Sequence, residues 1–289
     1  MEFDTQNGLL KTYELNGTPL IESGGALQFA RAQPDNERRQ KPPQDKIWNT
    51  AGKKAVVTDV NVEQQSSAVK VEILRNIPAV KASVATVYTV FATGEVAVET
   101  AFNLQQTPKK LLPAHYLSME WKLPKLMQQI EWFGRDEETY RDRAFEPIGR
   151  FKSTLDEEWV DYSKPQENGN KRAVRWAALT DADGHGLLVV ADGDLLDIGA
   201  RNYTHETMRK ADYSFQMKRA DSVILNVIAA QQGVGGINSW GRTPLEKHQL
   251  QKKMYAYASR LLPVVDSVDE ALARRVALGK TDVEKLSEN

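Results

Sequence analysis

Hydrophobic and polar residues alternate along much of the chain. Residues 56–62 carry Val, Thr, Val and Val at every second position, and residues 69–73 carry Val, Val and Ile in the same way. Because successive side chains of a strand point to opposite faces of a sheet, this period of two predicts half-buried β-strands. The clearest example is residues 82–102, where two alternating runs flank Thr93-Gly94 and predict a hairpin.

The same pattern predicts further strands and few helices. Two short strands around turns are expected over residues 2–20, where Asn16-Gly17 suits a tight turn. Residues 33–52 are rich in Pro, Asn, Gln and charge, and we expect a long surface loop there. Later strands are expected at residues 116–121, 128–133, 174–180, 186–191, 214–218, 223–229 and 253–262.

Many short strands and almost no central helix favour an all-β sandwich over a fold of alternating strands and helices. The best helix signal is near the end of the chain. Ser267 and Glu270 form a capping-box pattern, residues 271–278 favour helix, and Gly279 stands where a C-terminal cap belongs. We therefore expect a sandwich domain over residues 1–263 and a helical extension over residues 264–289.

Composition excludes several classes of partner. The 289 residues carry 38 basic and 39 acidic side chains, so no net field would attract nucleic acid or anionic lipid. The longest apolar runs, such as residues 187–191, are strand-sized, and we expect no membrane partner. No signal peptide is expected within residues 1–20. The absence of cysteine excludes disulfides and thiolate metal sites, and leaves a cytoplasmic and a periplasmic location equally open.

Residues that could carry catalysis are few. A glycosidase needs two carboxyl groups that face each other across the sugar. The acidic runs Asp136-Glu137-Glu138 and Asp156-Glu157-Glu158 are flanked by charge, and we expect solvated loops instead. The histidines lack the close spacing typical of a zinc site, and a separate core or surface role is expected for each of His115, His185, His205 and His248. No catalytic or metal-binding residue is assigned.

Residues 233–241, Gly-Val-Gly-Gly-Ile-Asn-Ser-Trp-Gly, are the segment that most suggests binding. The glycines permit tight turns, and we interpret the segment as a loop that displays the indole of Trp240. A flat indole can cover the C–H face of a sugar ring, and Asn238 and Ser239 could bond its hydroxyl groups. On loop context alone, a Trp240 that closes one end of the sandwich is an equally good interpretation.

Several motifs follow one another along the chain. Residues 29–37 read Phe-Ala-Arg-Ala-Gln-Pro-Asp-Asn-Glu, residues 48–52 read Trp-Asn-Thr-Ala-Gly, and residues 132–143 contain Trp-Phe-Gly-Arg and Glu-Thr-Tyr-Arg-Asp-Arg. Further motifs lie at residues 162–169, 175–176, 200–204, 225–226 and 233–241. Together they resemble, in order, motifs of the last domain of the large β-galactosidases of glycoside hydrolase family two.

This resemblance implies a many-stranded antiparallel super-sandwich, like that of galactose mutarotase, packed against a catalytic TIM barrel of the same polypeptide. In that family both catalytic glutamates and the nearby magnesium belong to the barrel, so no cofactor is expected in this segment. The sandwich extends one loop tryptophan into the sugar pocket. The matching residue is Trp240, which makes Trp240, Asn238 and Ser239 the candidate substrate-binding residues.

Three hypotheses about function follow. The first is an accessory domain that completes the sugar pocket of a retaining β-galactosidase-type hydrolase, inactive alone, with a galactoside or another glycan as ligand. The second is an autonomous carbohydrate-binding module built around Trp240. The third is a free-standing aldose epimerase, which rests on shared architecture alone and would need a well-placed acid and base, typically His and Glu.

Overall fold

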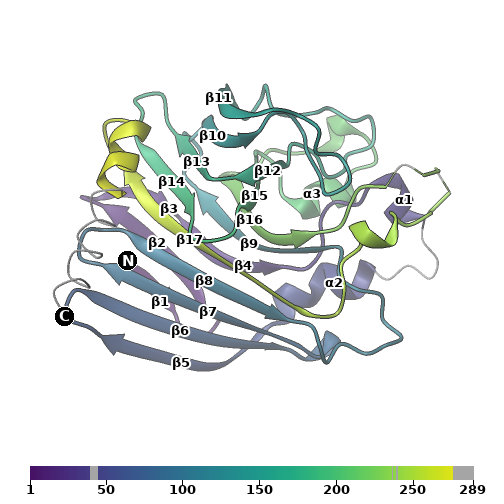
Figure 1. The fold of residues 1–289 in the computed structure, drawn as a ribbon, viewed down its shortest axis with the longest axis horizontal. Coiled ribbons are helices and arrows are strands. Elements are labelled where there is room, and N and C mark those ends of the chain that lie inside the picture. The colour runs from purple at the N-terminus through teal and green to yellow at the C-terminus, as the bar shows by residue number, and fades with distance from the viewer. Residues whose placement is uncertain (40–44, 236, 239, 276–289) are drawn as a thin grey trace.

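Two large antiparallel sheets form the body of the molecule (Figure 1). The computed structural model describes residues 1–39, 45–235, 237–238 and 240–275. Its strands are β1 (Glu2–Asp4), β2 (Leu9–Leu15), β3 (Thr18–Ile21), β4 (Ser23–Gln28), β5 (Val56–Gln64), β6 (Ala68–Ile77), β7 (Ala82–Phe91), β8 (Val96–Asn103), β9 (Tyr116–Leu123), β10 (Gln129–Arg135), β11 (Ile148–Thr154), β12 (Lys171–Val174), β13 (Trp176–Thr180), β14 (Gly186–Ala191), β15 (Leu196–Arg201), β16 (Val223–Gln231) and β17 (Met254–Val264).

The order of the strands confirms the all-β, many-stranded super-sandwich. The first sheet runs β1-β2-β4-β9-β16-β15-β12, with β3 paired to β2, and the second runs β11-β10-β13-β14-β17-β8-β7-β6-β5. One hydrophobic core joins the two sheets, because it contains Val98 and Phe102 of β8 together with Leu117 and Trp121 of β9. No helix in the described part of the chain is both long enough and apolar enough to cross a bilayer.

The middle of the first sheet is buried on both faces. Along β9, Leu117 and Met119 point into the core, while Ser118 and Glu120 on the opposite face are also buried. Buried polar groups need partners. The Ser118 hydroxyl donates to Asn226 Oδ1 (3.2 Å), and the side-chain amide of Gln28 donates to a Glu120 carboxylate oxygen (3.0 Å). The outer face of this sheet therefore carries a covered polar layer.

Short helices and loops gather at one end of the sandwich, at the right of Figure 1. Tyr116, on the outer face of β9, packs its ring edge-on against His205 at a centroid distance of 5.1 Å. The chain turns back over that end before entering β17. Besides the helical residues 268–275, the helical elements of the described part are α1 (Asp35–Arg38), α2 (Asp45–Ala51), α3 (His205–Lys210), η1 (Gly52–Lys54), η2 (Pro78–Val80), η3 (Ser214–Gln216) and η4 (Glu246–His248).

Most predicted strands are confirmed, and the hairpin of residues 82–102 forms β7 and β8. Residues 2–20 form three strands rather than two; the turn at Asn16-Gly17 has the expected positive φ angles of 50° and 82°. The strand predicted at residues 174–180 is divided at Arg175, and its parts, β12 and β13, belong to different sheets. Three strands, β4, β11 and β15, were not predicted.

The strand predicted at residues 214–218 is wrong. Residues 214–216 form the short helix η3 instead. The side-chain oxygen of Gln216 accepts the backbone N–H groups of Asp212 (2.7 Å) and Tyr213 (3.2 Å). These local bonds close a helical turn and outweigh the weak strand pattern of the segment.

The surface loop predicted at residues 33–52 is also wrong, because α1 and α2 lie within it, on either side of residues 40–44, which are outside the described part. Although residues 33–52 are mostly polar, a few apolar side chains among them contact the core. Trp48 stacks on Phe29 with 5.9 Å between ring centroids, and Ala51 is fully buried. These contacts fasten α2 to the core.

The predicted C-terminal helix begins as expected. Residues 268–275 are helical, and the backbone N–H of Glu270 donates to the Ser267 hydroxyl at 3.2 Å. Ala271 packs against Trp176 and Leu262 in a small second core. Residues 276–289, which include the predicted cap Gly279, lie outside the described part. The division of the chain at residue 263 stays a prediction.

Gly52, the last residue of the Trp-Asn-Thr-Ala-Gly motif at residues 48–52, gives a test of the packing of α2 on the core. A Cβ atom at Gly52 would overlap the backbone carbonyl of Leu27, which cannot move without disturbing β4. We expect Gly52→Ala to lower the free energy of unfolding by about 1–3 kcal/mol, measured by urea denaturation. Lys54→Ala, an exposed change in the same turn, is the control. Equal urea midpoints for Gly52→Ala and the unmodified chain would contradict this account.

Candidate functional site

A buried arginine holds the base of the segment that carries Trp240. Arg31 Nη1 donates to the carbonyl oxygen of Gln232, and Nη2 donates to that of Gly233, each at 2.9 Å. The carboxylate of Glu37 balances the charge, with 2.5 Å between Arg31 Nη2 and Glu37 Oε1. Gln232 Nε2 donates to the same carboxylate oxygen at 2.9 Å. The chain therefore leaves β16 along a fixed path.

Asp142 holds the next part of this segment. Its two carboxylate oxygens accept the backbone N–H groups of Val234 (3.0 Å) and Gly235 (2.9 Å). Gly235 has a φ of +85°, which favours glycine. A Cβ atom at Gly233 would overlap the Asp142 carboxylate. Glycine at position 235 is thus favoured by a positive φ, and glycine at position 233 by the close approach of an acid. Gly236 lies outside the described part.

Trp240 lies at the surface, where 81% of its area is exposed. The indole therefore does not close the end of the sandwich. Asn238 Oδ1 accepts the backbone N–H groups of Trp240 (2.9 Å) and Arg242 (3.4 Å), which shapes the tip of the loop. The guanidinium carbon of Arg39 lies 6.0 Å from the centroid of the indole. Ser239, the third candidate residue, lies outside the described part.

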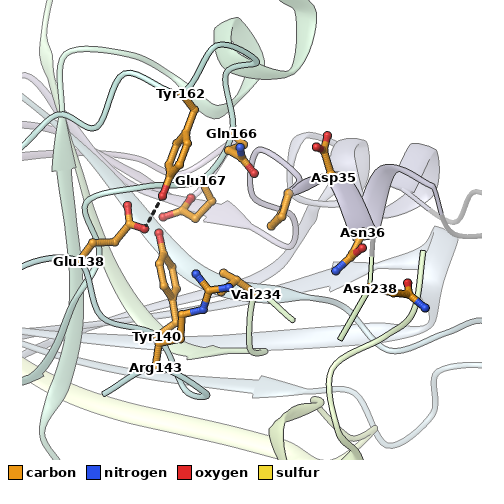
Figure 2. A pocket seen from close by; sticks show the side chains of 11 residues that line it. Asp35, Asn36, Glu138, Tyr140, Arg143, Tyr162, Gln166, Glu167, Val234 and Asn238 are labelled. Atoms are coloured by element: carbon orange, nitrogen blue, oxygen red, sulfur yellow. Dashed lines mark hydrogen bonds between the residues drawn. The ribbon is translucent and has the colours of Figure 1, made fainter. Parts of the chain in front are cut away.

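A pocket of about 330 Å³ opens beside this loop (Figure 2). Four segments that are distant in the sequence supply its walls, and each belongs to one of the motifs that carry the family resemblance. The lining residues are Pro34, Asp35, Asn36, Glu138, Tyr140, Arg143, Tyr162, Gln166, Glu167, Val234 and Asn238. We call this site the Tyr140 pocket.

Oxygen atoms gather at the inner end of the Tyr140 pocket. Figure 2 shows the carboxylates of Glu138 and Glu167 and the hydroxyls of Tyr140 and Tyr162 pointing toward one another. Glu138 accepts hydrogen bonds from the Tyr162 hydroxyl (3.0 Å) and the backbone N–H of Gly169 (2.8 Å). Burial raises the pKa of Glu138 in spite of these bonds, and the same burial raises the pKa of Tyr162 to about 12.

Glu167 belongs to a second buried ion pair. Arg201 donates to both of its carboxylate oxygens, at 3.1 and 3.0 Å. His205 lies behind this pair, and its Nδ1 accepts the backbone N–H of Ala32 at 3.1 Å. Burial and the charge of Arg201 lower the pKa of His205 well below its ordinary value. The imidazole is therefore neutral, with its proton on Nε2.

Two polar atoms of the Tyr140 pocket have no hydrogen-bond partner among the described residues. They are the hydroxyl of Tyr140 and Oδ1 of Asn36. These residues are 1% and 8% exposed. Burial raises the pKa of Tyr140 well above its ordinary value, so its hydroxyl keeps the proton and remains a donor. Two residues that line the pocket thus carry a buried donor and a buried acceptor that the described residues do not satisfy.

The predicted solvated acidic loops are confirmed only in part. Glu137, Asp156 and Glu157 are exposed. The prediction is wrong for Glu138, which lines the Tyr140 pocket, and for Glu158, which forms an ion pair with the buried Lys171. These contacts of Glu138 and Glu158 could not be predicted, because charged residues flank both glutamates in the sequence and their partners lie on other segments.

The histidines occupy separate core and surface positions, as predicted: His205 is buried, His185 is exposed, and His115 and His248 are partly buried. His115 and His205 each contact a carboxylate of the buried network, at 3.4 Å from Glu37 and Glu167 respectively. His185 groups with Asp181 and Asp183 at an exposed turn, with ligand atoms within 4.8 Å of one another. Asp181 already accepts the backbone N–H groups of the other two residues, so ordinary turn bonding explains this cluster. We assign no metal to it.

Comparison with known proteins gives one family. Residues 1–261 match the family described as beta galactosidase small chain. The chain is 28% identical over 243 residues to a β-galactosidase of Streptococcus thermophilus, which covers 82% of this chain and 23% of that protein. It is 32% identical over 218 residues to a β-galactosidase of Lactobacillus delbrueckii subsp. bulgaricus, with coverage of 74% and 21%. The chain spans about a quarter of the length of the curated relatives it matches.

Solved structures with a similar backbone include a galactose 1-epimerase from Lactobacillus acidophilus. The TM-score is 0.43 at 8% sequence identity, and the match covers 71% of this chain and 65% of that chain.

The unpartnered hydroxyl of Tyr140 predicts an unusual stability effect. A buried polar group without a partner costs about 1–3 kcal/mol, so Tyr140→Phe should leave the free energy of unfolding unchanged or raise it by about 1 kcal/mol. Tyr162→Phe is the matched control. It removes the hydrogen bond to Glu138 and should lower the free energy by about 1 kcal/mol. Urea denaturation measures both, and a clear loss of stability in Tyr140→Phe would contradict the geometry.

Glu37 predicts a pH dependence. Burial alone would raise its pKa, but the charges of Arg31 and His115 outweigh burial and hold the pKa well below the ordinary 4.5. A carboxyl group with a lowered folded-state pKa stabilises the fold above its unfolded-state pKa, and this contribution is lost as the pH falls. The free energy of unfolding should therefore decrease from about pH 5 to about pH 3.

In Glu37→Gln this part of the pH dependence should be absent. The variant will be less stable at neutral pH because Arg31 loses its counter-charge, so the comparison concerns the slope of free energy against pH. Urea denaturation at several pH values measures that slope. Glu63→Gln, at an exposed position, should keep the slope of the unmodified chain. An unchanged slope in Glu37→Gln would show that Glu37 does not contribute it.

Proposed function

This chain belongs to the beta-galactosidase small chain family, and we propose that it is the accessory sandwich domain of a retaining β-galactosidase-type hydrolase of glycoside hydrolase family two. In this proposal it completes the sugar pocket of a catalytic TIM barrel that lies in the same polypeptide. The ligand is a galactoside or a related glycan. The barrel, and not this chain, holds the catalytic glutamates and the magnesium.

The observation that carries the proposal is an exposed indole on a fixed base. Trp240 is 81% exposed, whereas Arg31 and Asp142 hold the backbone that precedes it through four hydrogen bonds to Gln232, Gly233, Val234 and Gly235. An indole presented in this way offers a flat apolar face to a sugar ring. The side-chain oxygen of Asn238 is engaged by the loop backbone, so a sugar contact of Asn238 would come from its amide nitrogen, a donor.

The described residues support an accessory role rather than hydrolysis by this chain. Glu138 and Glu167 share the inner end of the Tyr140 pocket, but both oxygens of Glu167 are bonded to Arg201. Glu138 in turn accepts bonds from Tyr162 and Gly169. A retaining glycosidase needs one carboxylate free to attack the sugar and one acid free to protonate the leaving group. We therefore assign no catalytic residue among those that the structure describes.

The aldose-epimerase hypothesis finds no suitable acid–base pair among the described residues at the Tyr140 pocket. His205, the histidine behind the Tyr140 pocket, is 2% exposed, and its Nδ1 is bonded to the backbone of Ala32. A proton-transfer group must reach the substrate. The autonomous binding module is the second candidate, because Trp240 is exposed on the chain itself. That function requires the 289-residue chain to bind a glycan without the barrel, which calorimetric titration with galactosides measures.

Replacement of Trp240 tests the proposal. In the complete polypeptide, Trp240→Ala should lower kcat/KM for a β-galactoside roughly 5- to 150-fold, because the sugar loses a stacking face. This factor corresponds to a loss of about 1–3 kcal/mol of transition-state stabilisation. Phe215→Ala is the matched control, since Phe215 is an aromatic side chain with the same 81% exposure on another segment. An unchanged kcat/KM in Trp240→Ala would refute the proposed role.

A further inference from the structure

The Tyr140 pocket combines separate features of a binding site. Its walls come from four segments, its volume of about 330 Å³ lies in the range of roughly 300–1,000 Å³ usual for small-molecule sites, and it contains two buried polar atoms without partners. The Tyr140 hydroxyl lies at the inner end, and Asn36 lies toward Asn238 (Figure 2). The two residues that carry these atoms therefore line the pocket at different ends.

The chemistry of the walls selects a neutral ligand with many hydroxyl groups. Tyr140 offers a donor, Asn36 Oδ1 an acceptor, and Arg143 further donors. Two of the carboxylates are already compensated, Glu167 by Arg201 and Asp35 by Arg38, which leaves little attraction for a cation. The carboxylate of Glu138, which is bonded to a neutral hydroxyl and a backbone N–H, disfavours an anion. A hydroxyl group both donates and accepts, so a saccharide matches this alternation of donors and acceptors.

The Tyr140 pocket adjoins the indole of Trp240. Asn238 lines the pocket, and its side-chain oxygen accepts the N–H of Trp240. On the other side, Asp35 and Asn36 of α1 line the pocket, and Arg39 directly after α1 lies over the indole ring. The pocket and the exposed indole are thus linked through the same two short segments.

We infer that the Tyr140 pocket is a second carbohydrate subsite, which holds a neutral hexose unit linked to the sugar that contacts Trp240. This inference rests on the proposed function, because it assumes that Trp240 contacts a sugar. The Tyr140 hydroxyl donates to a hydroxyl oxygen of the second unit, and Asn36 Oδ1 accepts one of its hydroxyl protons.

Two non-hydrolysable probes test the subsite in the complete polypeptide. They are methyl 1-thio-β-galactoside, with one sugar unit, and a thio-linked galactosyl disaccharide, with two. Calorimetric titration should show that the disaccharide binds more tightly than the monosaccharide. Tyr140→Phe should weaken disaccharide binding by roughly fivefold, the effect of one lost hydrogen bond, and leave monosaccharide binding unchanged. Tyr213→Phe, an exposed tyrosine that does not line the pocket, is the matched control.

The results distinguish this inference from the proposed function. Trp240→Ala should weaken both probes. If it does so while Tyr140→Phe changes neither probe, the subsite is refuted and the role of Trp240 stands. If Tyr140→Phe weakens only the disaccharide while Trp240→Ala changes neither probe, the subsite stands and the role of Trp240 fails. Equal weakening of both probes by Tyr140→Phe would place the pocket at the first sugar, which also refutes a second subsite.

Discussion

The fully buried guanidinium of Arg31 organises the end of the sandwich that carries the pocket and the Trp240 loop. It joins Glu37 of its own segment to the carbonyl groups of Gln232 and Gly233. It also lies 6.0 Å from the ring centroid of Tyr140. Removal of one partner from such a buried pair typically costs about 3–5 kcal/mol, because a charge is left uncompensated. Arg31 thus fixes the backbone of the segment after β16, and both the Tyr140 pocket and the Trp240 loop depend on this one side chain.

The strands could be predicted wherever one face is apolar and the other polar. The valines of β6 and β7 alternate clearly because one face of each strand is buried in the core. The valines of the edge strand β5 alternate as well, but Val56 and Val62 are 53% and 62% exposed. β4 was not predicted because Gly24-Gly25 interrupts its pattern. Glycine is needed at position 24, because a Cβ atom there would overlap the ring of Trp121. β11 is an edge strand in which charged residues flank Phe151. Where packing or an edge position determines the residue type, the period of two is lost.

The candidate site could be predicted from the sequence only where it is local. The glycine-rich loop indicated an exposed Trp240, since turn residues and the indole are neighbours in the chain. The Tyr140 pocket had no such signal. Glu138 is bonded to the backbone of Gly169, 31 positions away, and Glu167 pairs with Arg201, 34 positions away. No local pattern reports contacts of this range, so an acidic run flanked by charge had the appearance of a solvated loop.

Three groups at this end of the molecule are unfavourable for the chain alone. The Tyr140 hydroxyl and Asn36 Oδ1 are buried without partners in the part of the chain that the structure describes, and the Trp240 indole leaves a large apolar surface in water. The core between the two sheets supplies the stability that offsets them, as is common where binding sites depart from the most stable arrangement. A saccharide has hydroxyl groups for the first two and a C–H face for the third. One ligand could therefore relieve all three, which is why we consider them parts of a single site.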